Sequence, residues 1–406
     1  MMRSSVSGSG TPCSSFVYEG WCPTIPHFEP EIVERYLTGY PEETKENNLK
    51  SRGYSLKQKT ISERENFLRA VEFNNPEWIP IIFEFLPSVW KKYGNTLRDI
   101  LLRHPLIDTG LWLDQMQYDT TDPLFTEGTY YKDDWDCLWY NAQDGIIGQV
   151  IEHPISDWKA FTDLKVPNPL DQIDWKMLAG NMEEERRKEL PLLAFPESFA
   201  HGGFFDRLQF LRGLENLLVD FMTEPPQLND LIEIVLDYNM KYIQKWLEIG
   251  IDVMWFHGDI GTQNGLMISP RIFRKYLKPA YKKMFQACRQ EGVHVWYSCD
   301  GNILGIVDDL VECGVSIHDP QVRANTIDGI AQAYKGKLCP LVDIDEQMLP
   351  FCKPEDIDQQ FQEIVEKVGS PEGGLMIYAI PSMDVPLENI EALCSSWERH
   401  CFFQSI

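Results

Sequence analysis

Hydrophobic and polar positions alternate with two different periods along this chain, and the pattern predicts strands and helices in regular succession. Short apolar runs rich in Ile, Val, Phe and Trp are typical of buried strands. They occupy residues 78–86, 190–195, 251–256, 293–298, 315–319, 338–344 and 374–380. Apolar residues spaced three and four positions apart are typical of helices. They occupy residues 63–73, 204–222, 228–250, 269–292, 303–314, 325–336, 354–369 and 388–400.

Strands that alternate with helices of this length indicate βαβ units with parallel pairing. Seven to eight such units suit a closed barrel better than an open sheet. The pattern therefore predicts an α/β protein, with a (β/α)8 TIM barrel over residues 61–406.

Two segments depart from the alternation. Residues 1–60 are rich in Ser, Gly, Pro and charged residues, which predicts an N-terminal extension. It is read either as an arm that packs on a second subunit of a homodimer or as a mobile tail. Residues 119–160 are aromatic and carry a turn signal at Asp144 and Gly145, which predicts a β-hairpin insertion.

The charge balance excludes some partners. The chain has 406 residues, with 37 basic and 62 acidic ones, so its formal charge is −25. Nucleic acid and an anionic membrane surface are therefore unsuitable main partners. No run of about 18 apolar residues predicts a membrane span, and residues 1–16 lack the apolar core of a signal peptide. The ten scattered cysteines are typical of free thiols, so we expect a cytoplasmic protein.

Polar residues follow the predicted strands repeatedly, and in a barrel the active site lies at these carboxyl ends. They are Glu84, Glu197, His201, His257, Asp259, Ser298, Cys299, Asp300, His318, Asp319, Gln321, Asp343, Asp345, Ser382 and Asp384. Among them, His and Cys are residue types that zinc prefers, and carboxylates also serve as its ligands. The cluster predicted here is therefore either a metal site or a general acid–base site, with hydrogen-bonded loop residues as the plainer alternative.

Two arginines of the helix at 204–222 are further candidates. Arg207 and Arg212 could each anchor a carboxylate or phosphate of a substrate through two hydrogen bonds. The alternative for both is a salt bridge on the helix surface, with Asp206 or Glu215. Trp255, Trp296 and Tyr297 either line an apolar substrate pocket or pack in the core.

Several segments together resemble the uroporphyrinogen decarboxylase superfamily over roughly residues 62–400. The segments that carry the resemblance are residues 133–169, FFDRLQFLRGLEN at 204–216, residues 257–284, SCDGNI at 298–303, DPQVRAN at 319–325, residues 342–357 and DVPLENIEAL at 384–393. The resemblance implies a (β/α)8 barrel with its site at the carboxyl ends of the strands, which agrees with the independent pattern.

The superfamily contains two main chemistries. True uroporphyrinogen decarboxylases have an Arg-rich motif of the RQAGRY type after the first strand, whereas this chain has IIFEFLPSVWKKYGN at residues 81–95. The basic groups that would bind the propionates of a porphyrinogen are therefore missing. The other branch comprises methyltransferases that move a methyl group to or from the cobalt of a corrinoid protein. This chain has no DxHxxG corrinoid motif, so the corrinoid is expected on a partner protein.

In the methyltransferase branch a zinc ion activates a thiol. The ligands of this zinc ion come from a His-x-Cys-Gly motif and a later Cys. The corresponding segment here is Ser298-Cys299-Asp300-Gly301, and no Cys lies between Cys352 and Cys394. This departure favours the demethylating side of the chemistry, with an O-methyl or N-methyl substrate as the methyl donor. A zinc site in shifted register would use Cys299, Asp300 and His318.

These arguments give one set of expectations. The protein is expected to be a corrinoid-dependent methyltransferase, with a decarboxylase or a non-catalytic barrel scaffold as alternatives. The catalytic candidates are Asp259, His257, Asp300, His318 and Asp343. The substrate-binding candidates are Glu84, Glu197, His201, Arg207, Trp255, Tyr297 and Gln321.

Overall fold

The computed structural model describes residues 60–85, 87–104, 107, 126–144, 147–171, 173–194 and 203–403. Of the predicted N-terminal extension, Thr60 alone falls within these ranges. The candidate residues Glu197 and His201 lie outside them. Among the described helices, none is long and apolar enough to cross a membrane.

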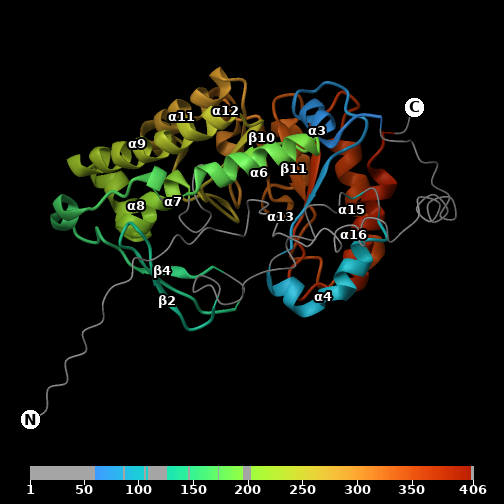
Figure 1. The fold of residues 1–406 in the computed structure, drawn as a ribbon, viewed down its shortest axis with the longest axis horizontal. Helices are drawn as coiled ribbons and strands as arrows, with labels where there is room; N and C mark the ends of the chain where they lie inside the picture. Colours follow the sequence, from blue (N-terminus) through green and yellow to red (C-terminus); the bar gives the residue numbers. More distant parts are fainter. Residues whose placement is uncertain are drawn as a thin grey trace, which may run out of the picture.

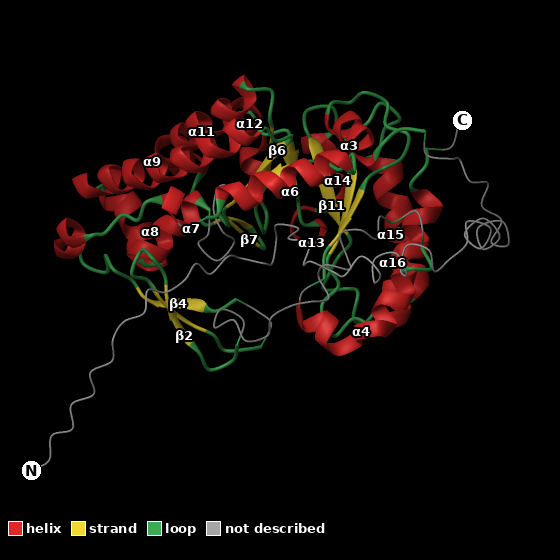
Figure 2. Cartoon of the chain, in the orientation of Figure 1, coloured by secondary structure: helices red, strands yellow, loops and turns green. Residues whose placement is uncertain are grey.

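Seven parallel strands form the centre of the described structure (Figures 1 and 2). They are β1 (Ile81–Phe83), β5 (Leu193–Ala194), β6 (Val253–His257), β9 (His294–Ser298), β10 (Ile317–His318), β11 (Cys339–Asp343) and β12 (Met376–Ala379). Their order in the sheet is β1-β12-β11-β10-β9-β6-β5, and every pairing is parallel. The sheet is curled and surrounded by helices, which confirms the predicted α/β-barrel fold class.

The helices pack around the sheet, with α9, α11 and α12 on one side and α15 and α16 on the other (Figure 1). The α-helices are α3 (Glu63–Val71), α4 (Pro87–Leu101), α6 (Trp175–Arg187), α7 (Phe204–Arg212), α8 (Leu214–Thr223), α9 (Pro226–Ile249), α10 (Pro270–Ile272), α11 (Lys278–Gln290), α12 (Val307–Cys313), α13 (Val322–Asn325), α14 (Ile327–Tyr334), α15 (Pro354–Lys367) and α16 (Leu387–His400). The other helical turns are η3 (Trp158–Asp163), η4 (Pro169–Asp171), the π-helical η6 (Phe273–Leu277) and η7 (Leu304–Ile306).

Local sequence signals explain several helix ends. The side chain of Ser62 caps α3 by accepting a hydrogen bond from the backbone N–H of Glu65 at 3.1 Å. Helix α9 starts with a proline, which suits the first helical position, and is followed by Gly250 at a φ of 83°. The predicted helix over residues 204–222 is in fact two helices. Gly213, at a φ of 82°, separates α7 from α8 because this conformation ends the helical ladder.

The region of the predicted hairpin insertion contains three antiparallel strands in the order β2-β3-β4. These are β2 (Tyr130–Lys132), β3 (Leu138–Tyr140) and β4 (Gln149–Glu152). Trp139 of β3 packs on Phe210 of α7 with their ring centroids 4.9 Å apart, so the small sheet is fastened to the barrel through this helix. A short hairpin of β7 (Gly261–Thr262) and β8 (Gly265–Leu266) follows β6.

Alternate residues of each barrel strand point to opposite faces of the sheet. One set forms an inner core together with residues of α3. It includes Val253, Trp255, Trp296, Ile317 and Leu341. The other set packs against the surrounding helices in a larger outer core. Helix α3 therefore covers the amino end of the strands, whereas α4 and the β2–β4 sheet lie toward the opposite end (Figure 1).

Candidate active site

A set of polar side chains continues the inner face of the barrel beyond the inner core. We call it the inner polar ring, because its members share the alternation of the inward-facing residues on six strands. Its members are Glu84, His257, Ser298, Asp319, Asp343 and Tyr378. Five of them stand at or just after the carboxyl end of a strand, and Tyr378 is one residue before the end of β12. The sequence predicted this place for Glu84, His257, Ser298, Asp319 and Asp343.

Two neighbouring pairs of the inner polar ring are joined by hydrogen bonds. The hydroxyl of Tyr378 donates to the carboxyl of Glu84 across the β12–β1 pair. The hydroxyl of Ser298 donates to Asp319 at 2.6 Å, and the same carboxyl accepts the indole N–H of Trp296 at 3.3 Å. The backbone N–H of Cys299 donates to the other carboxyl oxygen of Asp319 at 3.2 Å. These two pairs are therefore held in place by hydrogen bonds and are not independent loop residues.

Burial changes the ionisation of the carboxyl groups at this end of the barrel. Desolvation raises the pKa of Glu84, Asp319 and Asp343 to about 7 in each case. It raises the pKa of Glu346 further, to about 8, helped by the negative charges of Asp343 and of Asp300. These groups are thus partly protonated at neutral pH and can donate protons.

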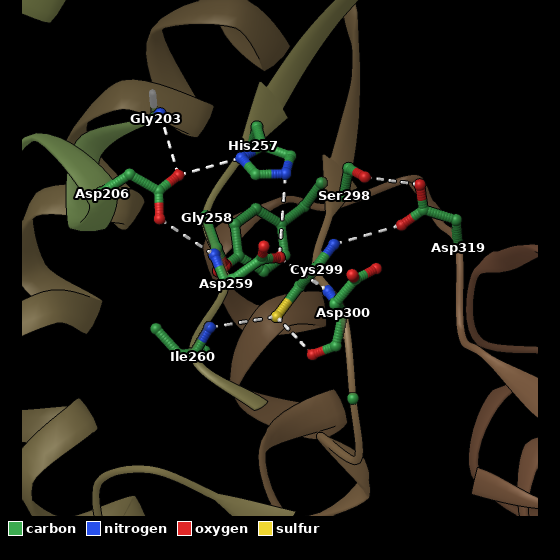
Figure 3. Close-up of polar contacts among 12 residues, drawn as sticks. Gly203, Asp206, His257, Gly258, Asp259, Ile260, Ser298, Cys299, Asp300 and Asp319 are labelled. Atoms are coloured by element: carbon green, nitrogen blue, oxygen red, sulfur yellow. Dashed lines mark hydrogen bonds and ion pairs between the residues drawn. The ribbon is translucent and has the colours of Figure 1, made fainter. Parts of the chain in front are cut away.

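His257 is held by carboxylates on two sides (Figure 3). Its Nδ1 lies 2.9 Å from an oxygen of Asp206 on α7, and its Nε2 lies 3.7 Å from an oxygen of Asp259. Burial alone lowers the pKa of His257, but the hydrogen bond and charge of Asp206, followed by the charge of Asp259, raise it to about 10. Its side chain is still 31% exposed, so this imidazolium can meet a ligand.

The loops after β6 and β9 meet directly beside His257. The backbone N–H of Asp300 donates to Asp259 at 2.9 Å, and the amide of Gln321 donates to the carboxyl of Asp300, also at 2.9 Å. Desolvation is the largest cause of a raised pKa at Asp259, which reaches about 6. The structure therefore brings four predicted residues, His257, Asp259, Asp300 and Gln321, to one place.

Strand alternation separates the residues predicted to bind zinc. Cys299 and His318 both belong to the outward-facing set, away from the inner polar ring. The Sγ of Cys299 accepts the backbone N–H of Ile260 at 3.5 Å, and burial keeps its pKa well above the usual range. His318 is fully buried, its Nδ1 lies 3.1 Å from the hydroxyl of Tyr334, and burial lowers its pKa to about 3.

Asp300, the third predicted ligand, is exposed and bonded to Gln321. In the described part of the chain, no group of three or more His, Cys, Asp or Glu side chains is placed to hold a metal ion. Cys299, Asp300 and His318 therefore do not fit the zinc site expected from the sequence, and His318 does not reach the ring as a catalytic group.

Three predicted substrate-binding residues have structural partners. The guanidinium of Arg207 lies 2.9 Å from Asp133, with both side chains fully buried, so it is engaged inside the protein. Trp255 stacks on Trp296 in the inner core with their centroids 4.3 Å apart. Tyr297 faces outward and donates to the carbonyl of Gly258 at 2.8 Å. None of the three lines the site in the way the sequence suggested.

Arg212, the other arginine considered, also forms a buried ion pair. Its partner is Asp220 of α8, at 2.7 Å, and not Glu215.

Four residues of the site are not among the functional candidates that the sequence favours. These are Asp206, Asp319, Glu346 and Tyr378. Asp319 belongs to the polar residues that follow strands, but the sequence favours its neighbour His318. The alternation of side chains along β10 could have identified Asp319, because Ile317 and Asp319 share the inner face of the sheet and His318 does not. Asp206 carries a weaker signal, a lone acid in the apolar first turn FFD of α7.

Comparisons with known proteins agree on the family and the fold. A family model described as uroporphyrinogen decarboxylase (URO-D) matches residues 140–400. Two curated uroporphyrinogen decarboxylases, from two strains of Thermus thermophilus, are each 26% identical to this chain over 208 residues. The match spans 48% of this chain and 57% of each relative, so it covers little more than half the length of these relatives.

One similar solved structure is a methyltransferase from Methanosarcina mazei, with a TM-score of 0.59. The two chains are 15% identical, and the match covers 84% of this chain and 99% of the other. At this level of identity the likeness concerns the fold.

Proposed function

The chain belongs to the uroporphyrinogen decarboxylase family, and from this premise we propose that it is a methyltransferase acting on a small O-methyl or N-methyl compound. The methyl group goes to the cobalt of a corrinoid carried by a partner protein. One observation carries the choice: the carboxyl end of the barrel is lined by protonatable carboxyls. In the described residues, none of Glu84, Asp319, Asp343 or Glu346 forms an ion pair with a lysine or arginine.

This charge pattern bears on the two chemistries of the family. A porphyrinogen with several carboxylates needs cationic partners, since its negative charges lose hydration on binding. The groups here would instead repel it whenever they ionise. A neutral or cationic methylated compound meets no such penalty, and the half-protonated carboxyls suit a reaction whose leaving group must take up a proton.

Asp319 is the proton donor in this proposal. It is half-buried, and its pKa of about 7 is near the optimum for a general acid at neutral pH. As the methyl–oxygen or methyl–nitrogen bond breaks, its electron pair stays on the heteroatom, which takes the proton of Asp319. The corrinoid supplies the nucleophile whose electron pair forms the new bond to carbon. The negative charges of Asp343 and Asp300 also raise the pKa of Glu346, so these carboxyls share one electrostatic environment.

The proposal is tested by following the visible spectrum of Co(I) cobalamin, alone and on a corrinoid protein, with the enzyme and a panel of methoxylated aromatics and methylamines. We expect methylation of the cobalt with at least one compound. Asp319→Asn should lower kcat by about 10²–10⁴-fold, the usual effect of losing a general acid. Asp309→Asn is the matched control, because this carboxylate lies in the first turn of α12 and pairs with Arg274 and Lys278.

Two outcomes would overturn the proposal. One is silence of the whole panel in the presence of the corrinoid protein. The other is release of CO₂ from a porphyrinogen, which would establish the decarboxylase alternative.

A further inference from the structure

Asp206 lies in the first turn of α7, outside the barrel strands, yet it is fully engaged with the site. Its two oxygens accept the backbone N–H of Gly203 at 3.1 Å and that of Asp259 at 3.3 Å. They also accept the side-chain amide of Gln209 at 3.2 Å and face Nδ1 of His257 at 2.9 Å. With 3% of its surface exposed, the carboxylate has no alternative partner in solvent.

The backbone around Asp206 fixes this arrangement. A Cβ atom placed on Gly203 would lie 1.4 Å from the carbonyl oxygen of His257, so α7 begins in direct contact with the end of β6. The side chains of Phe204, Phe205 and Leu208 anchor the same turn in the core, at 2%, 0% and 0% exposure. Neither Asp206 nor His257 can therefore move without disturbing the barrel.

Four hydrogen bonds keep Asp206 ionised. Burial by itself raises its pKa, but the hydrogen bond and charge of His257 and the two backbone N–H groups lower it below the usual range. The ring of His257 then has one allowed orientation. Nδ1 points to Asp206, and Nε2 lies 3.7 Å from an oxygen of Asp259 (Figure 3).

We propose that Asp206 is a positioning residue that holds His257 as a permanent imidazolium, whose Nε2–H binds the heteroatom from which the methyl group departs. This inference rests on the proposed function for the identity of that heteroatom. It gives His257 and Asp319 different tasks. A group with a pKa near 10 keeps its proton at neutral pH and stabilises developing negative charge, whereas one near 7 gives its proton away.

The ionisable groups around His257 determine whether its ring gains or loses a proton as pH changes. The ionisable groups that face it, or face its partners, are Asp206 on α7, Asp259 after β6, Asp300 after β9, Asp319 after β10, and the hydroxyls of Tyr281 and Tyr297. Burial raises the pKa of both tyrosines well above its usual range, so they stay neutral. The remaining groups are carboxyls, and every one of them that ionises favours the protonated ring.

The first experiment measures protonation directly and needs no substrate. The full chain, labelled with ¹⁵N in its eight histidines, is titrated by NMR, with His257→Gln used to assign the resonance. We expect His257 to remain protonated from pH 6 to pH 9. If its ring titrates near pH 6.5 in the wild type, the inference is overturned, whatever any variant does.

The second experiment measures kcat against pH for Asp206→Asn. If the ring returns to an ordinary pKa of about 6.5, about 3% of it is protonated at pH 8 and about three quarters at pH 6. We therefore expect kcat to fall about 30-fold at pH 8 and by less than about 2-fold at pH 6. A structural role alone would give a loss that does not change with pH.

Controls separate this inference from general damage and from the proposed function. Asp220→Asn removes another buried carboxylate, the partner of Arg212 on the adjacent α8, and should leave the pH profile unchanged. In a His257→Gln background, Asp206→Asn should have little further effect on kcat, because the two act as one unit. An additive loss would count against the pairing. If no methyl transfer is found but the titration behaves as expected, the proposed function fails and the Asp206–His257 relation stands.

Discussion

The buried ion pair between Arg207 and Asp133 allows a direct test of structure against sequence. The sequence offers Arg207 as an anchor for a substrate, and in the structure it joins α7 to the segment between β2 and β3. Its Nη1 lies 2.9 Å from Asp133, and neither side chain is exposed. Asp133 also accepts the backbone N–H of Trp135 at 3.0 Å and the indole N–H of Trp139 at 3.1 Å. Removing the guanidinium therefore leaves a buried carboxylate at the centre of this contact.

The change is Arg207→Met, which keeps much of the apolar stem. Breaking one side of a buried pair costs about 3–5 kcal/mol, because the other charge remains without compensation. Domains are stable by about 5–15 kcal/mol, so the loss is a large part of the total. Lys245→Met is the control. Its pair with Glu248 is exposed on α9 and should contribute no more than about 1 kcal/mol.

The effect should depend on pH. Burial raises the pKa of Asp133, but the charge and hydrogen bond of Arg207 lower it below its usual value overall. In the wild type this carboxylate therefore adds stability above its unfolded pKa, and the contribution is lost as pH falls through its folded pKa. In the variant burial acts without the guanidinium, so the folded pKa rises and ionisation becomes unfavourable as pH increases. The difference in stability should be greater at pH 7 than at pH 5.

Urea unfolding followed by tryptophan fluorescence, at both pH values, measures this difference. Limited proteolysis should also cut the β2–β4 sheet sooner in the variant, since its tie to α7 is lost. A stability loss below about 1 kcal/mol at pH 7, a value typical of exposed pairs, together with a raised KM would refute the reasoning and restore Arg207 as a substrate anchor.

Two further predictions concern the site. Gly203→Ala places a Cβ 1.4 Å from the carbonyl oxygen of His257, so we expect a loss of at least about 1–3 kcal/mol in urea unfolding; Gly180→Ala in α6, where no atom lies within 4 Å, should instead stabilise by about 0.5–1 kcal/mol. Asp319 binds its proton more tightly when folded than when unfolded, so its contribution to stability is fully present below about pH 4, its unfolded pKa, and is lost as pH rises through about 7. Asp319→Asn should therefore show a smaller decline in unfolding free energy between pH 5 and pH 8 than the wild type, and an unchanged decline would contradict the raised pKa.

The fold was largely predictable because its elements are long and periodic. The strand end at His257 followed from an apolar run that stops at a polar residue, whereas Glu84 and Asp343 lie inside the apolar runs predicted as strands. The direction of each side chain was harder to infer. In β9 both faces are buried, so VHVWYS shows no polar alternation that would place Cys299 on the outer side and Ser298 on the inner side. This ambiguity is why the sequence alone could not show that Cys299 and His318 face away from the inner polar ring.

Pairings across the fold were not predictable from local pattern. His257 and Asp206 are 51 positions apart, and Arg207 and Asp133 are 74 positions apart. Both pairs depend on where α7 packs, which is decided by the close approach of Gly203 to β6. A sequence shows that an acid and a base exist, but only the packing of the helix shows which acid meets which base.

The contact between the loops after β6 and β9 has a consequence for how such a site can change. A Cβ on Gly261 would lie 2.2 Å from the carbonyl oxygen of Asp300, and one on Gly301 would lie 2.6 Å from the carbonyl carbon of Gly261. Each backbone thus occupies the space that a side chain of the other would need. Neither loop can therefore be replaced by that of a relative unless the other loop is replaced too. For the same reason, a single substitution at either glycine is not tolerated unless the other loop changes with it. New substrate preferences are therefore expected to arise in the loops after β10, β11 and β12, and an engineered change in the first pair requires that both loops be exchanged together.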